Sequence, residues 1–302
     1  MSTLLVNGRM LFPDGKRKAF TLSYDDGITQ DRRLVKLFHQ YGVKGTFNLN
    51  PGLFGMSGTV SAGKKEVSHI RLDAEEVRTL YEGQEIAAHG QYHLCMAGMD
   101  TARCVNEILE SRKGLESVFD RPITGFAYAF GAYDESVLLA AEASGISYAR
   151  TTRSTGRFDV PENFLAWDPT CRHNDERLFD LAEEFLSGET YFSMRTPVKL
   201  FYVWGHSYEF EQDDNWERME QFLGKVGGQA DVWYATNGEI RDYVEAHRRL
   251  LYSVDGRFVY NPSAVSVWLA GSSCKEHVEV KPGGTAAMKI PDADREKYIV
   301  KL

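Results

Sequence analysis

The stretch FTLSYDDGITQD, residues 20 to 31, places two adjacent carboxylates directly after a run of mostly apolar residues. Adjacent carboxylates repel each other, and aspartate is disfavoured in strands. Gly27 follows Asp25 and Asp26 at once, so the pair has two interpretations. Either it forms a solvated turn, or a positive charge lies between these side chains and the rest of the fold.

The composition excludes several classes of protein. The chain has 302 residues, a net charge of −8, 43% hydrophobic and 26% charged residues, and four cysteines that form no CxxC pair. No excess of Lys and Arg is available for phosphates, which argues against a nucleic-acid partner. The N-terminus lacks a signal-peptide pattern, and the apolar runs are far shorter than the roughly 20 residues of a membrane span. We therefore expect a cytoplasmic protein with reduced thiols and no membrane partner.

Strand-like and helix-like segments alternate along residues 19–250. The first strand-like run, Ala19 to Tyr24, is followed by residues 29–42, whose apolar side chains recur at helical spacing. Such alternation predicts parallel strands joined by crossover helices, in an open sheet or a closed barrel. Polar residues, including His89 and His206, fall at or just past the ends of the strand-like runs. A barrel is favoured, because barrel enzymes carry their sites on that rim.

The pattern changes after about residue 250. Short alternating runs are separated there by DG, NP and PGG, which are turn signals. We therefore expect two parts, a barrel over residues 1–250 and a small β-rich extension over residues 251–302.

The segment AAHGQYH contains a candidate metal site. His89 and His93 are separated by three residues, and on a helical turn both rings would lie on one face, close enough to share a divalent ion. One aspartate of the DD pair would complete a His-His-Asp set typical of catalytic zinc, leaving the other to accept a proton from water. Two histidines at this spacing also occur by chance, and DDG alone is more often a turn.

Four segments carry a family resemblance: LSYDDG (residues 22–27), HGQYH (89–93), GFAYAFG (125–131) and YVWGH (202–206). In type, order and spacing they resemble the motifs of the polysaccharide deacetylases, the NodB-like carbohydrate esterase family 4, over roughly residues 15 to 245. The resemblance implies an α/β fold, a distorted seven-stranded β/α barrel related to the TIM barrel. The strand count read from the sequence agrees with this.

The resemblance also implies a site with one divalent metal, for which zinc is the first choice and cobalt, nickel, manganese or iron remain open. The residues it carries over are Asp25 as general base, Asp26, His89 and His93 as metal ligands, His206 as general acid, and the backbone N–H of Phe130 as oxyanion donor.

The third motif departs from the family pattern. The arginine that orients the catalytic aspartate falls on Ala127, the proline on Ala129 and the tyrosine on Phe130. Loss of that arginine removes a charge that would keep Asp25 ionised and aimed. Arg150, at the end of the next strand-like run, is a candidate substitute. The alternative is an arginine at the surface or the edge of the core.

Four further residues are candidates for the substrate site. Trp167 could form an apolar wall, Asp168 could partner His206, and His173 lies in the same segment. Glu209, just past YVWGH, could contact substrate. The alternatives are a solvated loop for His173 and an exposed rim for Glu209.

These observations favour a metal-dependent hydrolase that removes acetyl groups from an N-acetylated sugar or related amide. A small molecule or an oligosaccharide is the expected substrate, and a homo-oligomer is left open. Two alternatives remain. One is a C–N hydrolase of the cyclic imide or allantoin type on the same scaffold, which would release no acetate. The other is a non-catalytic carbohydrate-binding barrel, whose sugar affinity a chelator would not change.

Overall fold

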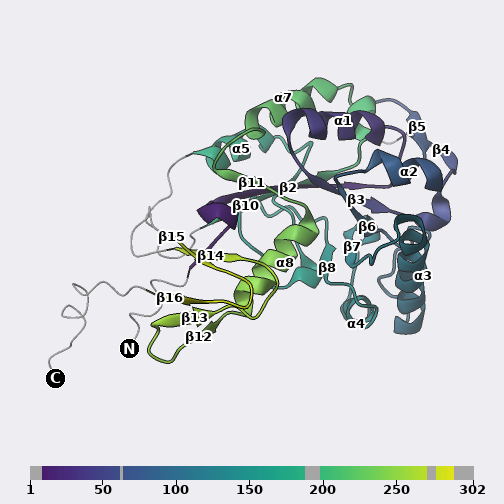
Figure 1. Cartoon of the computed structure of the whole chain (residues 1–302). Coiled ribbons are helices and arrows are strands. Elements are labelled where there is room, and N and C mark those ends of the chain that lie inside the picture. Colours follow the sequence, from purple (N-terminus) through teal and green to yellow (C-terminus); the bar gives the residue numbers. More distant parts are fainter. Residues whose placement is uncertain (1–8, 62–63, 188–197, 271–276, 289–302) are drawn as a thin grey trace.

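The computed structural model describes residues 9–61, 64–187, 198–270 and 277–288 (Figure 1). Within them, seven strands form a continuous parallel path in the order β8-β7-β6-β3-β2-β10-β9, and β11 pairs with β2 off this path. The expected α/β barrel class is confirmed, because the sheet curls and helices cover its outside. The strands are β2 (Lys18–Asp25), β3 (Gly45–Leu49), β6 (Glu85–Ala88), β7 (Gly125–Ala127), β8 (Tyr148–Arg150), β9 (Cys171–Arg172), β10 (Lys199–Gly205) and β11 (Val232–Tyr234).

Strand β2 is the centre of the sheet and is buried along its whole length. On one side it pairs with all of β10, from Lys18 to Tyr24. On the other side β11 pairs with its first half and β3 with its second half. An apolar run of this kind is typical of a strand covered on both faces. Because neighbouring strands are parallel, Asp25 at the end of β2 lies at the same edge as the ends of β3 and β10.

The helices follow the strands in the expected alternation. The first begins after Gln30, buries Leu34, Val35 and Phe38, and ends at Gly42, whose φ of 63° suits a residue without Cβ. The helices are α1 (Asp31–Tyr41), α2 (Ala74–Leu80), α3 (Thr101–Phe119), α4 (Glu135–Ala143), α5 (Leu178–Leu186), α6 (Glu209–Gln212), α7 (Trp216–Val226) and α8 (Asn237–Arg248). Among the described helices, none is both long and apolar enough to cross a bilayer.

A short segment connects the two margins of the curled sheet. Trp167 forms an isolated parallel bridge with Arg150 of β8, and Cys171 pairs with Val203 of β10. The segment 167–171 therefore bonds to β8 at one end and to β10 at the other. The barrel is least regular in this segment, because its strand β9 has only two residues.

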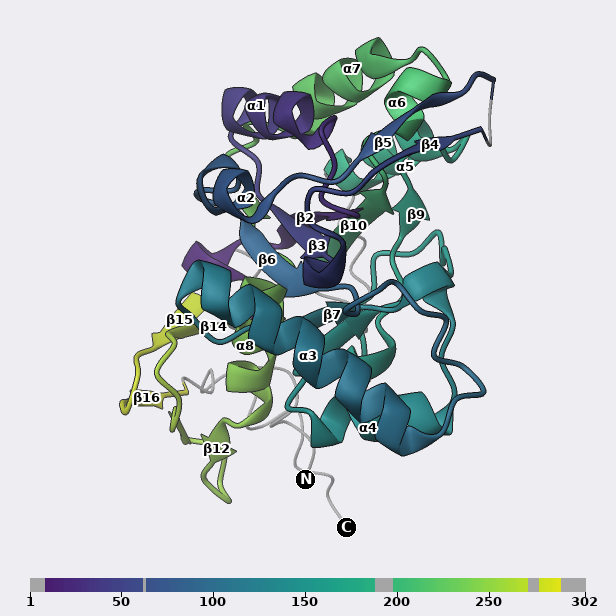
Figure 2. The ribbon, with the colours of Figure 1, turned by 90° about the vertical axis from the view of Figure 1, so that its right-hand side faces the viewer.

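A hairpin that the sequence pattern did not predict leaves the barrel between β3 and α2. It consists of β4 (Ser57–Val60) and β5 (Val67–Ile70), which pair antiparallel. Figure 2 shows it as an arm beside α6. Gln212 of α6 donates to the carbonyl of Val60, and Gln30 donates to the carbonyl of Ser68. The hairpin therefore connects the loop after β2 with the loop after β10.

The C-terminal part contains five short strands: β12 (Leu251–Tyr252), β13 (Phe258–Tyr260), β14 (Val267–Ala270), β15 (His277–Val280) and β16 (Thr285–Ala287). They form two small sheets, and β1 (Met10–Leu11) joins one of them by pairing with β14. The N-terminal strand thus belongs to the extension sheet, while the boundary near residue 250 stays a prediction. Cys274 and residues 289–302 lie outside the described residues, and the other three cysteines are unpaired.

Candidate active site

Asp26, His89 and His93 come together at the carboxyl ends of β2 and β6. One ligand atom of each lies within 4.8 Å of the others. His93 Nε2 is 3.9 Å from Asp26 Oδ1, and the two imidazole centroids are 4.7 Å apart. Asp26 and His93 have φ of 86° and 57°, a conformation that costs of order 1–3 kcal/mol for a residue with Cβ and that clusters at functional sites.

Two atoms of this cluster are buried without a hydrogen-bond partner among the described residues: Asp26 Oδ1 and His89 Nε2. His89 Nδ1 lies 2.7 Å from the carbonyl oxygen of Ala127, so this nitrogen carries the proton and the lone pair of Nε2 is free. Burial lowers the pKa of His89 to about 4, which keeps the ring neutral near pH 7. Unpartnered buried acceptors are costly. The donor set therefore fits a divalent cation.

The turn that carries His89 and His93 is held from two sides, by Asn50 and by Glu107. Asn50 Nδ2 donates to the carbonyls of His89 at 2.5 Å and Gly90 at 2.9 Å. Glu107 of α3 accepts the backbone N–H of Tyr92 at 2.7 Å. Gly90 has φ of 81°, and a Cβ there would lie 3.1 Å from Glu107 Oε1, so this turn suits glycine.

Asp25 lies beside the cluster in a different environment. Asn48 Nδ2 donates to Oδ1 at 2.7 Å, and Arg150 Nη2 donates to Oδ2 at 2.5 Å. Arg150 is completely buried and also lies over the ring of Trp204, so it is at neither the surface nor the edge of the core. Burial alone would raise the pKa of Asp25, but Arg150, followed by His89 and His206, outweighs burial and lowers this pKa.

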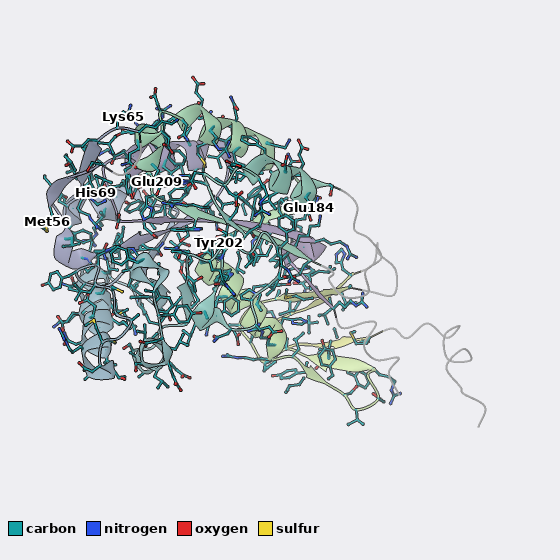
Figure 3. The ribbon with its side chains drawn as sticks, turned by 180° about the vertical axis from the view of Figure 1, so that it is seen from behind. Met56, Lys65, His69, Glu184, Tyr202 and Glu209 are labelled. Atoms are coloured by element: carbon teal, nitrogen blue, oxygen red, sulfur yellow. The ribbon has the colours of Figure 1, made fainter. Side chains whose placement is uncertain are left out.

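His206 faces Asp25 from the end of β10. Its Nε2 is 3.8 Å from Asp25 Oδ2, and its Nδ1 is 2.6 Å from Glu209 Oε1. Burial lowers the pKa of His206, but the hydrogen bond that His206 donates to Glu209 and the charges of the nearby aspartates raise this pKa above its usual value. Glu209 is buried, so the alternative of an exposed rim is wrong for it, while its contact with substrate stays a prediction. Figure 3 shows Glu209 and His69 toward one end of the molecule and Glu184 toward the other.

Asp168 does not partner His206. Its carboxylate accepts hydrogen bonds from Thr151 and from Arg153. The reason is the bridge between the neighbouring residue Trp167 and β8, which directs Asp168 to the loop that follows β8. Glu209, three residues after His206, takes the place expected for Asp168.

His173 and Trp167 lie behind the site. His173 is buried and stacks against Tyr24 and Phe210, with Nε2 3.2 Å from Glu209 Oε2. It therefore supports Glu209 and is not a solvated loop residue. Trp167 is buried in the barrel core and packs against Phe164 and Tyr202, so the expectation that it forms an apolar wall of the site is wrong.

Phe130 lies at the rim of the site. It follows β7 in the short 3-10 turn Ala129–Gly131, with φ of 59°. The residue is 68% exposed, and its ring contacts the ring of His93 edge-on, with centroids 4.7 Å apart. The ring is thus available to solvent, while the backbone turn lies next to a candidate ligand.

Two residues that the sequence interpretation missed contact Asp26. His69 Nε2, on β5, is 3.0 Å from Oδ2, and Arg71 Nη2 is 3.1 Å from Oδ1, outside the geometry of a hydrogen bond. Burial raises the pKa of Asp26, but the His69 hydrogen bond and the Arg71 charge outweigh burial and hold this pKa well below its usual range. The signal that the sequence offers for them is their spacing of two in VSHIRL, residues 67–72, which in a strand places both side chains on one face.

Known proteins were compared with the chain. Residues 13–149 match the sequence model of the family described as polysaccharide deacetylase. The Bacillus subtilis (strain 168) protein named "Putative polysaccharide deacetylase YxkH" is 26% identical over 147 residues, covering 47% of this chain and 48% of that protein. The chain thus spans about half the length of this curated relative.

Two solved structures share the fold. The crystal structure of a "putative polysaccharide deacetylase" from Mycobacterium smegmatis superposes with a TM-score of 0.54 at 19% identity, covering 78% of this chain and 93% of that one. "Puue Allantoinase" superposes with a TM-score of 0.52 at 15% identity, covering 76% and 91%. These matches confirm the fold and, with the family model, the resemblance to polysaccharide deacetylases.

Proposed function

From this relationship to the polysaccharide deacetylases, we propose that the chain is a metal-dependent hydrolase that removes an acetyl group from an N-acetylated sugar or a related amide. The observation that carries the proposal is the different environment of the two adjacent aspartates. Asp26 has an oxygen that accepts no hydrogen bond and lies beside two histidines, whereas both oxygens of Asp25 accept hydrogen bonds and Asp25 faces His206.

In this proposal Asp26, His89 and His93 hold one divalent ion. Two imidazoles and one carboxylate suit zinc, and cobalt, nickel, manganese and iron are the alternatives. When bound, the ion would polarise the acyl carbonyl and lower the pKa of water. The neutral state of His89 and the ionised state of Asp26 are the forms that such binding requires.

The proton transfers fall to Asp25 and His206. Ionised Asp25, held by Asn48 and Arg150, accepts a proton from the water that attacks the acyl carbon. His206, held by Glu209, donates its proton to the nitrogen as the C–N bond breaks, which releases acetate and the amine. The backbone N–H of Phe130 would donate to the developing oxyanion, a contribution of about 3 kcal/mol in comparable sites.

A second reaction on the same residues is the hydrolysis of a cyclic amide. Two observations favour it: Ala127 stands where the deacetylase motif has arginine, and the allantoinase fold covers 76% of this chain. Attack of water on a ring carbonyl would use Asp25 and His206 in the same way. The products differ, since ring opening releases no acetate.

The proposal is tested first by metal content. Mass spectrometry on the purified protein after incubation with zinc should give about one equivalent, lost in His93→Ala. His39→Ala is the matched control, because His39 lies in α1 and contacts the carbonyl of Glu82. No metal in the parent after incubation with zinc, cobalt or nickel would contradict the proposal and favour a non-catalytic carbohydrate-binding barrel.

Substrate screening then separates the two reactions. Acetate release from N-acetylated sugars supports deacetylation, while loss of a cyclic imide or of allantoin without acetate supports ring opening. Activity that survives removal of the metal by a chelator would contradict both.

A further inference from the structure

We propose that Arg71 and Asn50 form a clamp that holds the two halves of the metal site at ligating distance before any metal binds. The halves are the turn with Asp26 and the turn with His89 and His93. The inference rests on the proposed function, because it takes these three residues as metal ligands. Arg71 and Asn50 are positioning residues, since they would act only through the ligands.

The clamp contacts the aspartate half through one guanidinium. Arg71 Nη1 donates to the backbone carbonyl of Asp26 at 2.8 Å, and Nη2 lies 3.1 Å from Asp26 Oδ1. Asp26 has a φ of 86°, which a residue with Cβ keeps only where its surroundings enforce it. The bond to the carbonyl of Asp26 is therefore placed to hold the strained peptide as well as the side chain.

The same guanidinium nitrogen reaches the histidine half through Asn50. Arg71 Nη1 donates to Asn50 Oδ1 at 2.5 Å, and Asn50 Nδ2 donates to the carbonyls of His89 and Gly90. Both side chains are buried. A continuous chain of hydrogen bonds thus connects Asp26 to His89 through the side chains of Arg71 and Asn50. The Asn50 amide takes part with both its oxygen and its nitrogen.

The backbone fixes Arg71 in place. Its N–H donates to the carbonyl of Met56 at 2.8 Å, and the next N–H, of Leu72, donates to the carbonyl of Gly27 at 2.8 Å. Arg71 also forms an antiparallel bridge with Ile28. Arg71, which follows hairpin β4–β5, is therefore held against the loop after β2 by backbone contacts. Its side chain extends from a fixed backbone position.

Two roles for Arg71 predict opposite effects on metal affinity. If it only neutralises Asp26, its removal frees the carboxylate and the metal binds more tightly. If it positions the ligands, its removal weakens metal binding, because partners of this kind are worth about 10–100-fold in affinity. Arg71 Nη1 donates to two neutral acceptors, the backbone carbonyl of Asp26 and the amide oxygen of Asn50. These two hydrogen bonds favour positioning, since they fix geometry and do not neutralise a carboxylate.

The experiment measures zinc affinity by competition with a chromogenic chelator, for the parent, Arg71→Met, Arg71→Lys, Asn50→Ala and the double variant Arg71→Met/Asn50→Ala. We expect each single variant to bind zinc about 10–100-fold more weakly. The double variant should be no weaker than the worse single variant, because the two side chains act as one unit. The visible spectrum of the cobalt-loaded protein should change in the same variants, since it reports ligand geometry.

Arg112→Met is the matched control. Arg112 of α3 donates to the carbonyl of Ser144 and pairs with Glu116, away from the ligands. It should lower thermal stability while zinc affinity stays within about twofold of the parent, as expected for an independent site. Circular dichroism of the metal-free variants shows that each is folded. If Arg71→Met does not fold, Arg71→Lys and Asn50→Ala carry the test.

The outcomes separate this inference from the proposed function. A parent that binds neither zinc, cobalt nor nickel overturns both. A parent that binds zinc, with Arg71→Met binding equally or more tightly, overturns the clamp and leaves the hydrolase proposal standing. Additive losses in the double variant also overturn it, because they would mean that Arg71 and Asn50 act separately.

Discussion

Asp25 and Asp26 share a peptide bond but lie in opposite surroundings. Asp25 ends β2, and both of its oxygens accept hydrogen bonds, from Asn48 of β3 and Arg150 of β8. Asp26 leaves the strand with a positive φ, and its Oδ1 has no hydrogen bond and faces histidines. The difference teaches that the position of the strand end, more than the residue type, places two identical side chains in different environments.

The largest effect should come from exchanging the two aspartates for asparagine, one at a time. Asp26→Asn should lose the metal and all activity. Asp25→Asn should keep the metal while kcat falls about 10³-fold, the scale of a lost general base. Metal content and product release measured on the same samples check both. Equal metal loss in the two variants would remove the distinction between them.

Arg150→Met should reduce kcat about 10²-fold with metal content unchanged, because Asp25 loses the partner that aims it. Arg150→Lys keeps a charge and should recover part of the rate. Arg153→Met is the control, since Arg153 follows the same strand, is exposed and pairs with Asp168. Parent-like rates in Arg150→Met would show that this buried arginine serves packing alone.

A third aspartate, Asp31, sharpens the comparison, because within the described part of the chain no cation is among the main groups that shift its pKa. Asp31 accepts hydrogen bonds from Ser207 and Tyr81, and burial raises its pKa from 3.8 to about 7. The folded state therefore holds a proton that the unfolded state releases. Stability from this group is complete below about pH 4 and is lost as pH rises through 7, by up to roughly 4 kcal/mol.

Asp31→Asn should remove that dependence. Denaturant unfolding at several pH values between 4 and 8 should give a flatter profile than the parent. A matching decline in the variant would assign the pH dependence to other groups. The control Asp120→Asn changes an exposed carboxylate, paired with Arg78 at the surface, and should leave the parent profile unchanged.

The smallest effect is expected at Phe130. Its ring is exposed, and the proposed oxyanion donor is its backbone N–H. Phe130→Tyr should therefore change kcat by less than about twofold and stability by less than about 0.5 kcal/mol. Steady-state rates and thermal unfolding measure the two quantities. A large loss of rate would mean that the ring itself contacts substrate.

The sequence predicted the alternation of the barrel because buried strands and amphipathic helices leave a periodic pattern. It missed hairpin β4–β5, since most side chains of these strands are exposed and show no alternation toward a core. His69 and Arg71 were missed for the same reason, because no strand was predicted at residues 67–72 on which to place them.

The partners inside the site were harder to predict than its main residues. Asp25, Asp26, His89 and His93 follow strand-like runs, so a common edge could be expected from topology. The pairing of His206 with Glu209, in place of Asp168, depends on a four-residue helix and on one bridge to β8. Contacts of this kind arise from side-chain packing between distant segments, which no local pattern records.

The central position of β2 has a consequence for the order in which the chain can fold during synthesis. Strand β2 ends at Asp25, yet its neighbours β10 and β11 begin at Lys199 and Val232, and β1 pairs with Leu269. A ribosome that adds about 5–20 residues per second needs roughly ten seconds or more to supply those partners. Until then β2, which ends at Asp25 directly before Asp26, has an unpaired edge. Closure of the barrel and assembly of its site are therefore among the last events in folding of the nascent chain.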